Sequence, residues 1–211
     1  MSEEHDCTNW NPLSVAEVGE LLSDLRAEWW IAGGYAIEMF AGRPIRSHGD
    51  IDILVKRDDQ HIIQKHLSAW ELYSARYPGL RLWGEGETLI GRYHDIWCRP
   101  KGETPWRLQI MLLDTEGDVW FFRNNPSIFG SVRNMSRMTG SGIRYLSPEI
   151  QLLYKAGANM LEKDETDFAV AAPMLNEAER AWLLENLRKR FPAEHQWIEK
   201  LKAVTEKVSL G

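Results

Sequence analysis

Two glycines separate a strand-like run from a helix-like run in WWIAGGYAIEMFAG, residues 29–42. The stretch WWIA is short, aromatic and β-branched, which is typical of a strand. The stretch after the glycines has helical content and ends at Gly42, a residue common just after a helix. A second strand-like run, DIDILVK, follows at residues 50–56. This order predicts a strand, a tight turn, a helix and a second strand that carries two acidic side chains.

Asp50 and Asp52 flank a single isoleucine in the second predicted strand. Side chains alternate along a strand, so both carboxylates would project from one face while Ile51, Ile53 and Val55 point into the core. Neighbouring carboxylates repel each other unless a cation lies between them. Their oxygen atoms suit Mg²⁺, which takes its remaining ligands from water and substrate phosphates. The pair therefore predicts a metal site, and the alternative is the solvent-facing side of an edge strand.

The glycine pair strengthens the first of these interpretations. Gly33 and Gly34 lie between a strand and a helix, where bare backbone N–H groups and the helix N-terminus attract a phosphate. A simple tight turn is the alternative. Arg46 and His48 fall on the carboxylate side if the backbone stays extended back to Arg46. A phosphate site and a carboxylate pair one helix apart predict a nucleotide and metal site.

The rest of the chain divides into a strand-rich part and a helical part. Further strands are expected in ELYSARY (71–77), RYHDIWCRP (92–100), WRLQIMLLD (106–114) and DVWFFR (118–123). Helices are expected to begin at Ser14, Asp58, Ser147 and Asn176, and a last helix covers residues 192–204. Glu17 would complete a capping box with Ser14, and Glu179 lies three residues after Asn176. Pro148 would occupy the first helical position after Ser147. We expect an α+β fold with a mixed, twisted sheet flanked by helices at residues 1–142 and a helical C-terminal part at residues 143–211.

Composition narrows the classes of partner. The chain has 211 residues, 44% of them hydrophobic, and a net charge of -6. This charge argues against a broad nucleic-acid surface, which requires clustered Lys and Arg. No apolar run is long enough to span a bilayer, and the acidic start MSEEHDCTNW lacks the apolar run of a signal peptide. With two cysteines and no disulfide pattern, a cytoplasmic protein is expected.

The segment GGYAIEMFAGRPIRSHGDIDI resembles nucleotidyltransferases of the DNA polymerase β-like superfamily. Within that superfamily it is similar to aminoglycoside 2''-adenylyltransferases and lincosamide nucleotidyltransferases. The resemblance is carried by Gly-Gly-Tyr-Ala, Arg-x-His and Asp-x-Asp in this order and spacing, and the later stretches YLSPEIQLLYKA and KDETDF extend it. The resemblance implies a nucleotidyltransferase fold and transfer of AMP from ATP to a small-molecule hydroxyl, with release of pyrophosphate.

The resemblance also implies roles for single residues. Asp50 and Asp52 would hold Mg²⁺, and the backbone N–H groups of Gly33 and Gly34 would bind the β- and γ-phosphates of ATP. Three further residues are candidates for the nucleotide site: Arg46 as a donor to the triphosphate, His48 in a hydrogen-bonding or structural role, and Lys155 near the phosphates. Ordinary ion pairs and solvated lysines are the alternatives for Arg46 and Lys155.

One position departs from the family pattern. The family has a third carboxylate on a later strand, which serves as metal ligand and general base, and the matching position here is Gln109. A glutamine side chain cannot accept a proton from the acceptor hydroxyl. Asp95, across the expected hairpin, is the better substitute, and Asp114 falls on the opposite strand face from Gln109. The departure opens a second hypothesis, a nucleotidyltransferase-like binding or antitoxin-type regulatory protein with weak or no catalysis.

The sequence leaves open the identity of the hydroxyl acceptor and the oligomeric state. The acidic net charge favours a cationic acceptor such as an aminoglycoside.

Overall fold

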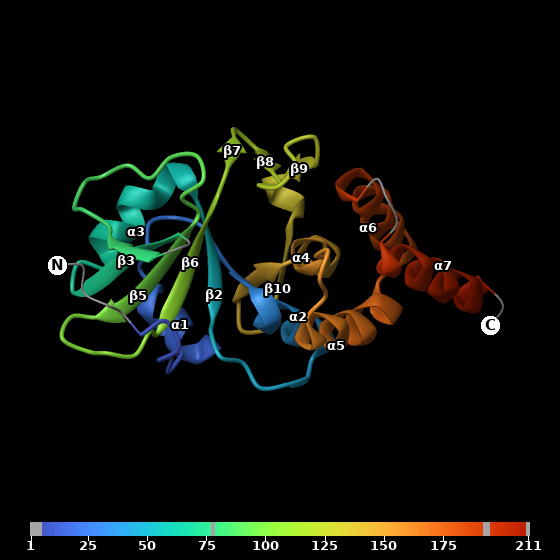
Figure 1. Ribbon diagram of the computed structural model, residues 1–211, viewed down its shortest axis with the longest axis horizontal. Coiled ribbons are helices and arrows are strands. Elements are labelled where there is room, and N and C mark those ends of the chain that lie inside the picture. The colour runs from blue at the N-terminus through green and yellow to red at the C-terminus, as the bar shows by residue number, and fades with distance from the viewer. Residues whose placement is uncertain (1–5, 77–78, 192–194, 210–211) are drawn as a thin grey trace.

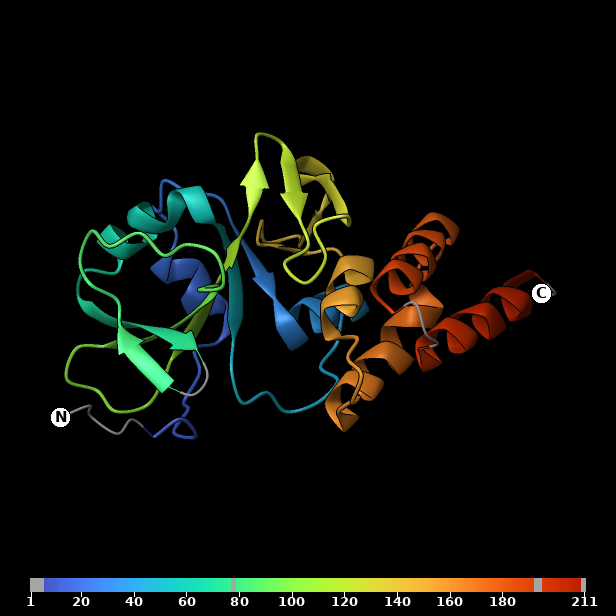
Figure 2. The same ribbon diagram turned by 45° about the horizontal axis from the view of Figure 1, so that its top comes forward.

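A computed structural model of the chain describes residues 6–76, 79–191 and 195–209. Figure 1 shows a strand-rich half on the left and the last helices on the right, and Figure 2 gives the same division from a second direction. In the strand-rich half the elements are α1 (Val15–Leu21), β1 (Trp29–Ala32), α2 (Gly33–Ala41), β2 (Asp52–Lys56), α3 (Gln60–His66), β3 (Trp70–Arg76), β4 (Gly79–Leu82), β5 (Asp95–Pro100) and β6 (Leu108–Leu113). They are followed by β7 (Thr115–Glu116), β8 (Val119–Phe121), β9 (Phe129–Ser131), β10 (Ser136–Met138), β11 (Arg144–Leu146), α4 (Pro148–Lys155), α5 (Glu162–Ala171), α6 (Glu177–Arg190) and α7 (Gln196–Ser209).

Among the described residues, eight strands form one mixed sheet in the order β10-β11-β1-β2-β6-β5-β3-β4. The pairs β1–β11 and β2–β6 are parallel, and β1–β2 and β5–β6 are antiparallel. The short strands β7, β8 and β9 form a separate antiparallel sheet. The expected α+β fold with a mixed sheet and flanking helices is thereby confirmed.

Apolar side chains from the central strands form the core. Ile51, Ile53 and Val55 are completely buried, as the alternation in DIDILVK predicts. Helix α2 packs against α4 and α5, so the helix after the glycine pair joins the sheet to the C-terminal helices. None of the helices in the described part of the chain has both the length and the apolar character that crossing a bilayer requires.

Local signals located several elements correctly. Ser14 and Asn176 both begin helices with complete capping boxes, formed with Glu17 and Glu179. Helix α2 ends at Ala41, and Gly42 follows with a φ of 69°, which glycine adopts most readily. Pro148 opens α4 as expected, but the Ser147 side chain makes no capping hydrogen bond.

Other local predictions were wrong. Strand β2 begins at Asp52, so Asp50 precedes the strand, and the backbone is not a strand back to Arg46 because residues 42–51 form a loop. Asp58 lies in a 3-10 turn and caps no helix; α3 begins at Gln60 and ends at His66. Residue 77 of a predicted strand and residues 192–194 of the last predicted helix lie outside the described residues.

The division of the chain at residues 142 and 143 stays a prediction. Strand β11, just after that boundary, pairs with β1 inside the main sheet through Ile31 and Tyr145. The sheet therefore draws one strand from the part that was expected to be helical.

Candidate active site

The turn between β1 and α2 brings the backbone against the side chain of Asp52. Ala32, the last residue of β1, pairs in register with Asp52, the first residue of β2. Gly33 follows with φ of +66°, and a Cβ atom there would lie 2.1 Å from Asp52 Oδ2. Glycine is required at residue 33 for two reasons, the backbone conformation and the space that the carboxylate occupies.

Gly34 is required for a different contact. A Cβ atom on Gly34 would lie 2.3 Å from His48 Cε1 and 2.5 Å from the Arg46 guanidinium. The two glycines therefore let the carboxylate from β2 and the side chains from the 42–51 loop approach the start of α2. This is a close-approach requirement that glycine meets because it has no side chain.

Asp52 is an acid in an unfavourable environment. Burial raises the pKa of Asp52 to about 7, and the negative charges of Asp50 and Asp95 add to the shift, whereas Lys155 opposes it. A carboxyl group that resists ionisation in this way is stabilised in its charged form by a bound cation. Mg²⁺ is commonly held by one or two protein carboxylates, with substrate phosphates supplying further oxygens, so Asp50 and Asp52 fit that ion. Within the described ranges, no group of three or more His, Cys, Asp or Glu side chains is arranged to hold a metal.

Gln109 is a direct neighbour of Asp52 in the sheet. Strands β2 and β6 run parallel with Asp52 opposite Gln109. On the other side of β6, Trp97 lies opposite Gln109 and Asp95 lies opposite Met111. The family position of the third carboxylate, inferred from the sequence, is thus a position beside Asp52 that carries a neutral amide.

The two acids considered as substitutes for that carboxylate both have cationic partners. Asp95, the first residue of β5, accepts a hydrogen bond of 2.9 Å at its Oδ1 atom from Arg123. Asp114 pairs with the Arg57 guanidinium, which also donates to the backbone carbonyl of Tyr93 at 2.7 Å. Asp114 therefore serves a structural ion pair, while Asp95 is close enough to Asp52 to affect its pKa.

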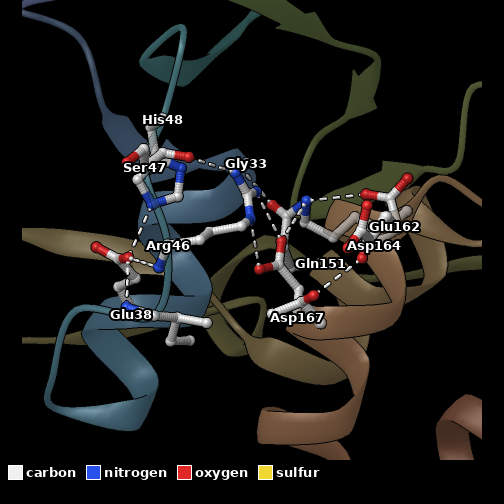
Figure 3. A network of polar contacts seen from close by, with 12 residues as sticks. Gly33, Glu38, Arg46, Ser47, His48, Gln151, Glu162, Asp164 and Asp167 are labelled. Atoms are coloured by element: carbon white, nitrogen blue, oxygen red, sulfur yellow. Dashed lines mark hydrogen bonds and ion pairs between the residues drawn. The ribbon is translucent and has the colours of Figure 1, made fainter.

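Arg46 binds a carboxylate from the C-terminal half of the chain. Its Nε and Nη2 atoms each donate to one oxygen of Asp167, both at 2.9 Å (Figure 3). Lys155 Nζ lies 2.7 Å from the same carboxylate and 3.2 Å from Asp164 Oδ1. Asp167 is completely buried. We call Arg46, Lys155, Asp164 and Asp167 the four-charge cluster.

The four-charge cluster differs from the surface ion pair that was the alternative for Arg46. Hydrogen bonds to both cations outweigh burial and lower the pKa of Asp167, although burial alone is the largest single influence and raises it. Two donor nitrogens of Arg46 are engaged by Asp167, so contact of Arg46 with a triphosphate stays a prediction, as it does for Lys155.

His48 belongs to a second set of contacts that fixes the 42–51 loop. His48 Nε2 lies 2.9 Å from Glu38 Oε1, and its ring lies against Tyr35 with centroids 4.2 Å apart. The same Glu38 oxygen accepts the backbone N–H groups of Ile45 at 2.7 Å and Arg46 at 3.2 Å (Figure 3). These contacts agree with the structural role considered for His48.

Gln151 of α4 holds the glycine turn. The Gly33 N–H donates to Gln151 Oε1 at 2.8 Å, and the Gln151 side chain is buried. In this arrangement the Gly33 N–H is engaged by the protein, and binding of phosphates by Gly33 and Gly34 stays a prediction. Nothing in the spacing of the sequence distinguished Gln151 from the other polar residues of its helix.

A cavity of about 320 Å³ joins these parts. Its lining includes Gly33, Asp52, Gln151, Tyr154, Lys155 and Lys163. A larger cavity of about 850 Å³ lies between α3 and the β3–β4 hairpin and shares no lining residue with it. The smaller cavity is the candidate active site because Asp52, the glycine turn and two lysines line it.

Residues 14–82 match the family model described as Aminoglycoside-2''-adenylyltransferase. This stretch contains both glycines, Arg46, His48 and both aspartates of the site. Over that stretch the chain is homologous to adenylyltransferases. No curated protein sequence matches the chain.

Two solved structures of similar proteins cover most of the chain. The lincosamide antibiotic adenylyltransferase LnuA, in a lincomycin-bound structure, is 20% identical with a TM-score of 0.53, over 76% of this chain and 97% of LnuA. ANT(2'')-Ia, in complex with adenylyl-2''-tobramycin, is 12% identical with a TM-score of 0.55, over 84% of this chain and 96% of that protein. The chain has a nucleotidyltransferase fold. In this nucleotidyltransferase fold Asp52 of the expected Asp-x-Asp begins β2 and borders the cavity, whereas Asp50 precedes the strand.

Proposed function

We propose that the protein is a metal-dependent nucleotidyltransferase that transfers AMP from ATP to a hydroxyl of a small molecule, such as an aminoglycoside or lincosamide antibiotic, and releases pyrophosphate. The observation that carries the proposal is the partly exposed Asp52 beside the glycine turn in the cavity, because its raised pKa indicates that its charged form requires a cation. The match of residues 14–82 to an adenylyltransferase family supports the reaction type. The lincomycin-bound structure of LnuA and the complex of ANT(2'')-Ia with adenylyl-2''-tobramycin support the acceptor class by analogy.

In the proposed reaction the acceptor hydroxyl oxygen bonds to the α-phosphorus of ATP, and the bond from that phosphorus to the bridging oxygen of pyrophosphate breaks. Mg²⁺, held by Asp50 and Asp52, would supply positive charge to the attacking and leaving oxygens. Lys155 and Lys163 line the same cavity and are suited to the triphosphate charge. Asp95 is our candidate to accept the hydroxyl proton, since Gln109 cannot.

A binding or regulatory role is the second candidate, and the amide of Gln109 beside Asp52 is the observation that favours it. In that role the protein would bind Mg-ATP without turning it over. A cytoplasmic location remains a prediction in either case.

Pyrophosphate release distinguishes the two candidates. The protein is incubated with Mg-ATP and a panel of aminoglycosides and lincosamides, alongside Asp50→Asn, Asp52→Asn and the exposed control Asp58→Asn. Acceptor-dependent release that both site variants lose and the control keeps would support transfer. Nucleotide binding without release on any acceptor would support the regulatory role.

A further inference from the structure

Gln151 lies on the wall of the candidate active site, one helical turn before Lys155 on α4. Residues four positions apart share a helix face, and both of these side chains line the cavity. To the described residues the Gln151 side chain makes one hydrogen bond, which it accepts from the Gly33 backbone (Figure 3). The two ends of its amide group therefore have different surroundings.

The Gly33 backbone determines the orientation of this amide. The oxygen and nitrogen of a glutamine side chain are similar in shape, and their positions follow from hydrogen bonding. A backbone N–H can only donate, so the Gln151 atom that lies 2.8 Å from the Gly33 nitrogen is the acceptor Oε1. The amino group at Nε2 is therefore directed away from the Gly33 N–H.

The Nε2 atom of Gln151 is a donor that a ligand can reach. Within the part of the chain that the structure describes, no group accepts a hydrogen bond from it. It is also not among the side-chain atoms there that lack a partner and are sealed off from solvent. Gln151 as a whole is 4% exposed, and the cavity is the space that it lines. The accessible surface of Nε2 therefore faces the cavity.

The surroundings of this donor favour an anionic oxygen. Lys155 and Lys163 line the same cavity, and Asp52 lies against the turn that holds Gln151. A Mg²⁺ ion held by a carboxylate commonly takes further oxygens from substrate phosphates. Lysine attracts a phosphate as a point charge, whereas an amide N–H in a fixed orientation selects the direction from which an oxygen approaches.

We propose that Gln151 is a phosphate-binding residue of the site, which donates from Nε2 to an oxygen of the nucleotide triphosphate. The Gly33 N–H has a positioning role, because it holds the amide in the orientation that this donation requires. The glycine turn then contacts the phosphate through Gln151, in place of the direct contact that the family resemblance implies for Gly33. The inference rests on the nucleotidyltransferase function proposed above.

Side-chain amide signals test the contact. The protein is labelled with ¹⁵N-glutamine, the Gln151 signals are assigned with Gln151→Met, and tripolyphosphate and ATP are titrated separately in the presence of Mg²⁺. We expect both to give a saturable shift of the Gln151 signals, and adenosine, which has no phosphate, to give none. A shift with ATP and adenosine but not with tripolyphosphate would place the nucleoside at Gln151 and overturn the proposal.

Substitutions measure the contribution of the donor. Gln151→Met has a side chain of similar length without the amide, and we expect it to bind Mg-ATP about tenfold more weakly, as for loss of a hydrogen bond to a charged group. Gln60→Met is the matched control, because Gln60 is 3% exposed, accepts the Leu89 N–H at 2.6 Å and lies outside the cavity lining. The control should lose stability and keep its affinity for Mg-ATP. Unchanged or tighter binding by a folded Gln151→Met would show that Gln151 only occupies the turn, and would overturn the proposal.

This inference and the proposed function fail in different ways. If an acceptor supports pyrophosphate release while Mg-ATP leaves the Gln151 signals unmoved, the phosphate contact is wrong and the transferase function stands. If Mg-ATP and tripolyphosphate shift these signals but no acceptor supports release, the phosphate contact stands and the transfer reaction is wrong. If neither ATP nor tripolyphosphate binds, both are refuted.

Discussion

Gln109 lies in register with Asp52 across the parallel pair of β2 and β6. The family pattern has an acid at this position. An aspartate at residue 109 would therefore lie beside Asp52 in the sheet. With an amide at residue 109, one negative charge fewer lies next to Asp52, whose pKa is already raised by desolvation and by its acidic neighbours. This exchange lowers repulsion in the empty site and removes a proton acceptor.

We expect Gln109→Asp to increase the rate of transfer when a true acceptor is present, because it restores a metal ligand and base. The measurement is kcat for pyrophosphate release, with Gln109→Asn as the control of similar chemistry and no charge. An unchanged or lower rate would show that another group, with Asp95 as the first candidate, accepts the proton.

Gly33→Ala is expected to disrupt the site far more than Gly42→Ala. Both glycines have positive φ, of 66° and 69°, so both variants carry the backbone cost of about 1–2 kcal/mol for an L-residue there. Only at residue 33 does the new Cβ meet Asp52, because nothing lies within 4 Å at residue 42. Thermal unfolding of both variants measures the loss of stability, and Mg-ATP binding measures the additional effect of the contact between the new Cβ atom and Asp52. Equal binding by the two variants would contradict the close-approach role of Gly33.

The stability of the metal-free protein should depend on pH through Asp52. In the folded chain this carboxyl keeps its proton up to a pKa of about 7, whereas its ordinary value is 3.8. Between these pH values the folded state binds the extra proton, so the free energy of unfolding falls as pH rises. The upper limit of the effect is about 4 kcal/mol, since one pKa unit corresponds to about 1.4 kcal/mol.

Chemical denaturation at a series of pH values checks this expectation. Asp52→Asn cannot ionise, so its stability should fall less than that of the wild type between about pH 4 and pH 7. The contribution of Glu149, whose pKa is raised in the same direction, is common to both proteins and cancels in the comparison. Parallel curves for the two proteins would refute the assignment to Asp52.

Asp167→Asn should destabilise the fold by about 3 kcal/mol or more, because it leaves Arg46 and Lys155 next to a neutral amide in a buried place. Asp118→Asn is the matched control, as it removes an exposed carboxylate that lies 3.4 Å from Arg133 and should cost less than about 1 kcal/mol. Urea unfolding compares them. A similar loss in both variants would mean that the four-charge cluster adds no more than a surface pair.

The sequence-based predictions were correct where the interacting residues are close together in the sequence, and they missed contacts between residues that are far apart in it. Capping at Ser14 and Asn176 depends on residues three positions away, and both capping boxes were found. The core face of β2 follows from alternation alone. By contrast, the partner of Arg46 is 121 residues away, and no spacing in the sequence relates it to Asp167.

In the candidate active site, too, some residues could be predicted from the sequence and others could not. Gln109, assigned from the resemblance to the position of the third carboxylate, lies opposite Asp52 in the sheet. Gln151 and Asp164 were not found, since a buried amide that accepts one N–H and an acid that meets one lysine have no periodic signature. The Asp58 cap failed because the chain forms a 3-10 turn there, which places Asp59 before α3.

The bond between Arg46 and Asp167 also bears on the order of events during synthesis. Glu38 holds the loop that leads into Asp50 from the neighbouring helix, but the second anchor of this loop is Asp167 of α5, so a ribosome must release most of the polypeptide before the second anchor can form. A nascent chain would therefore complete the candidate active site late.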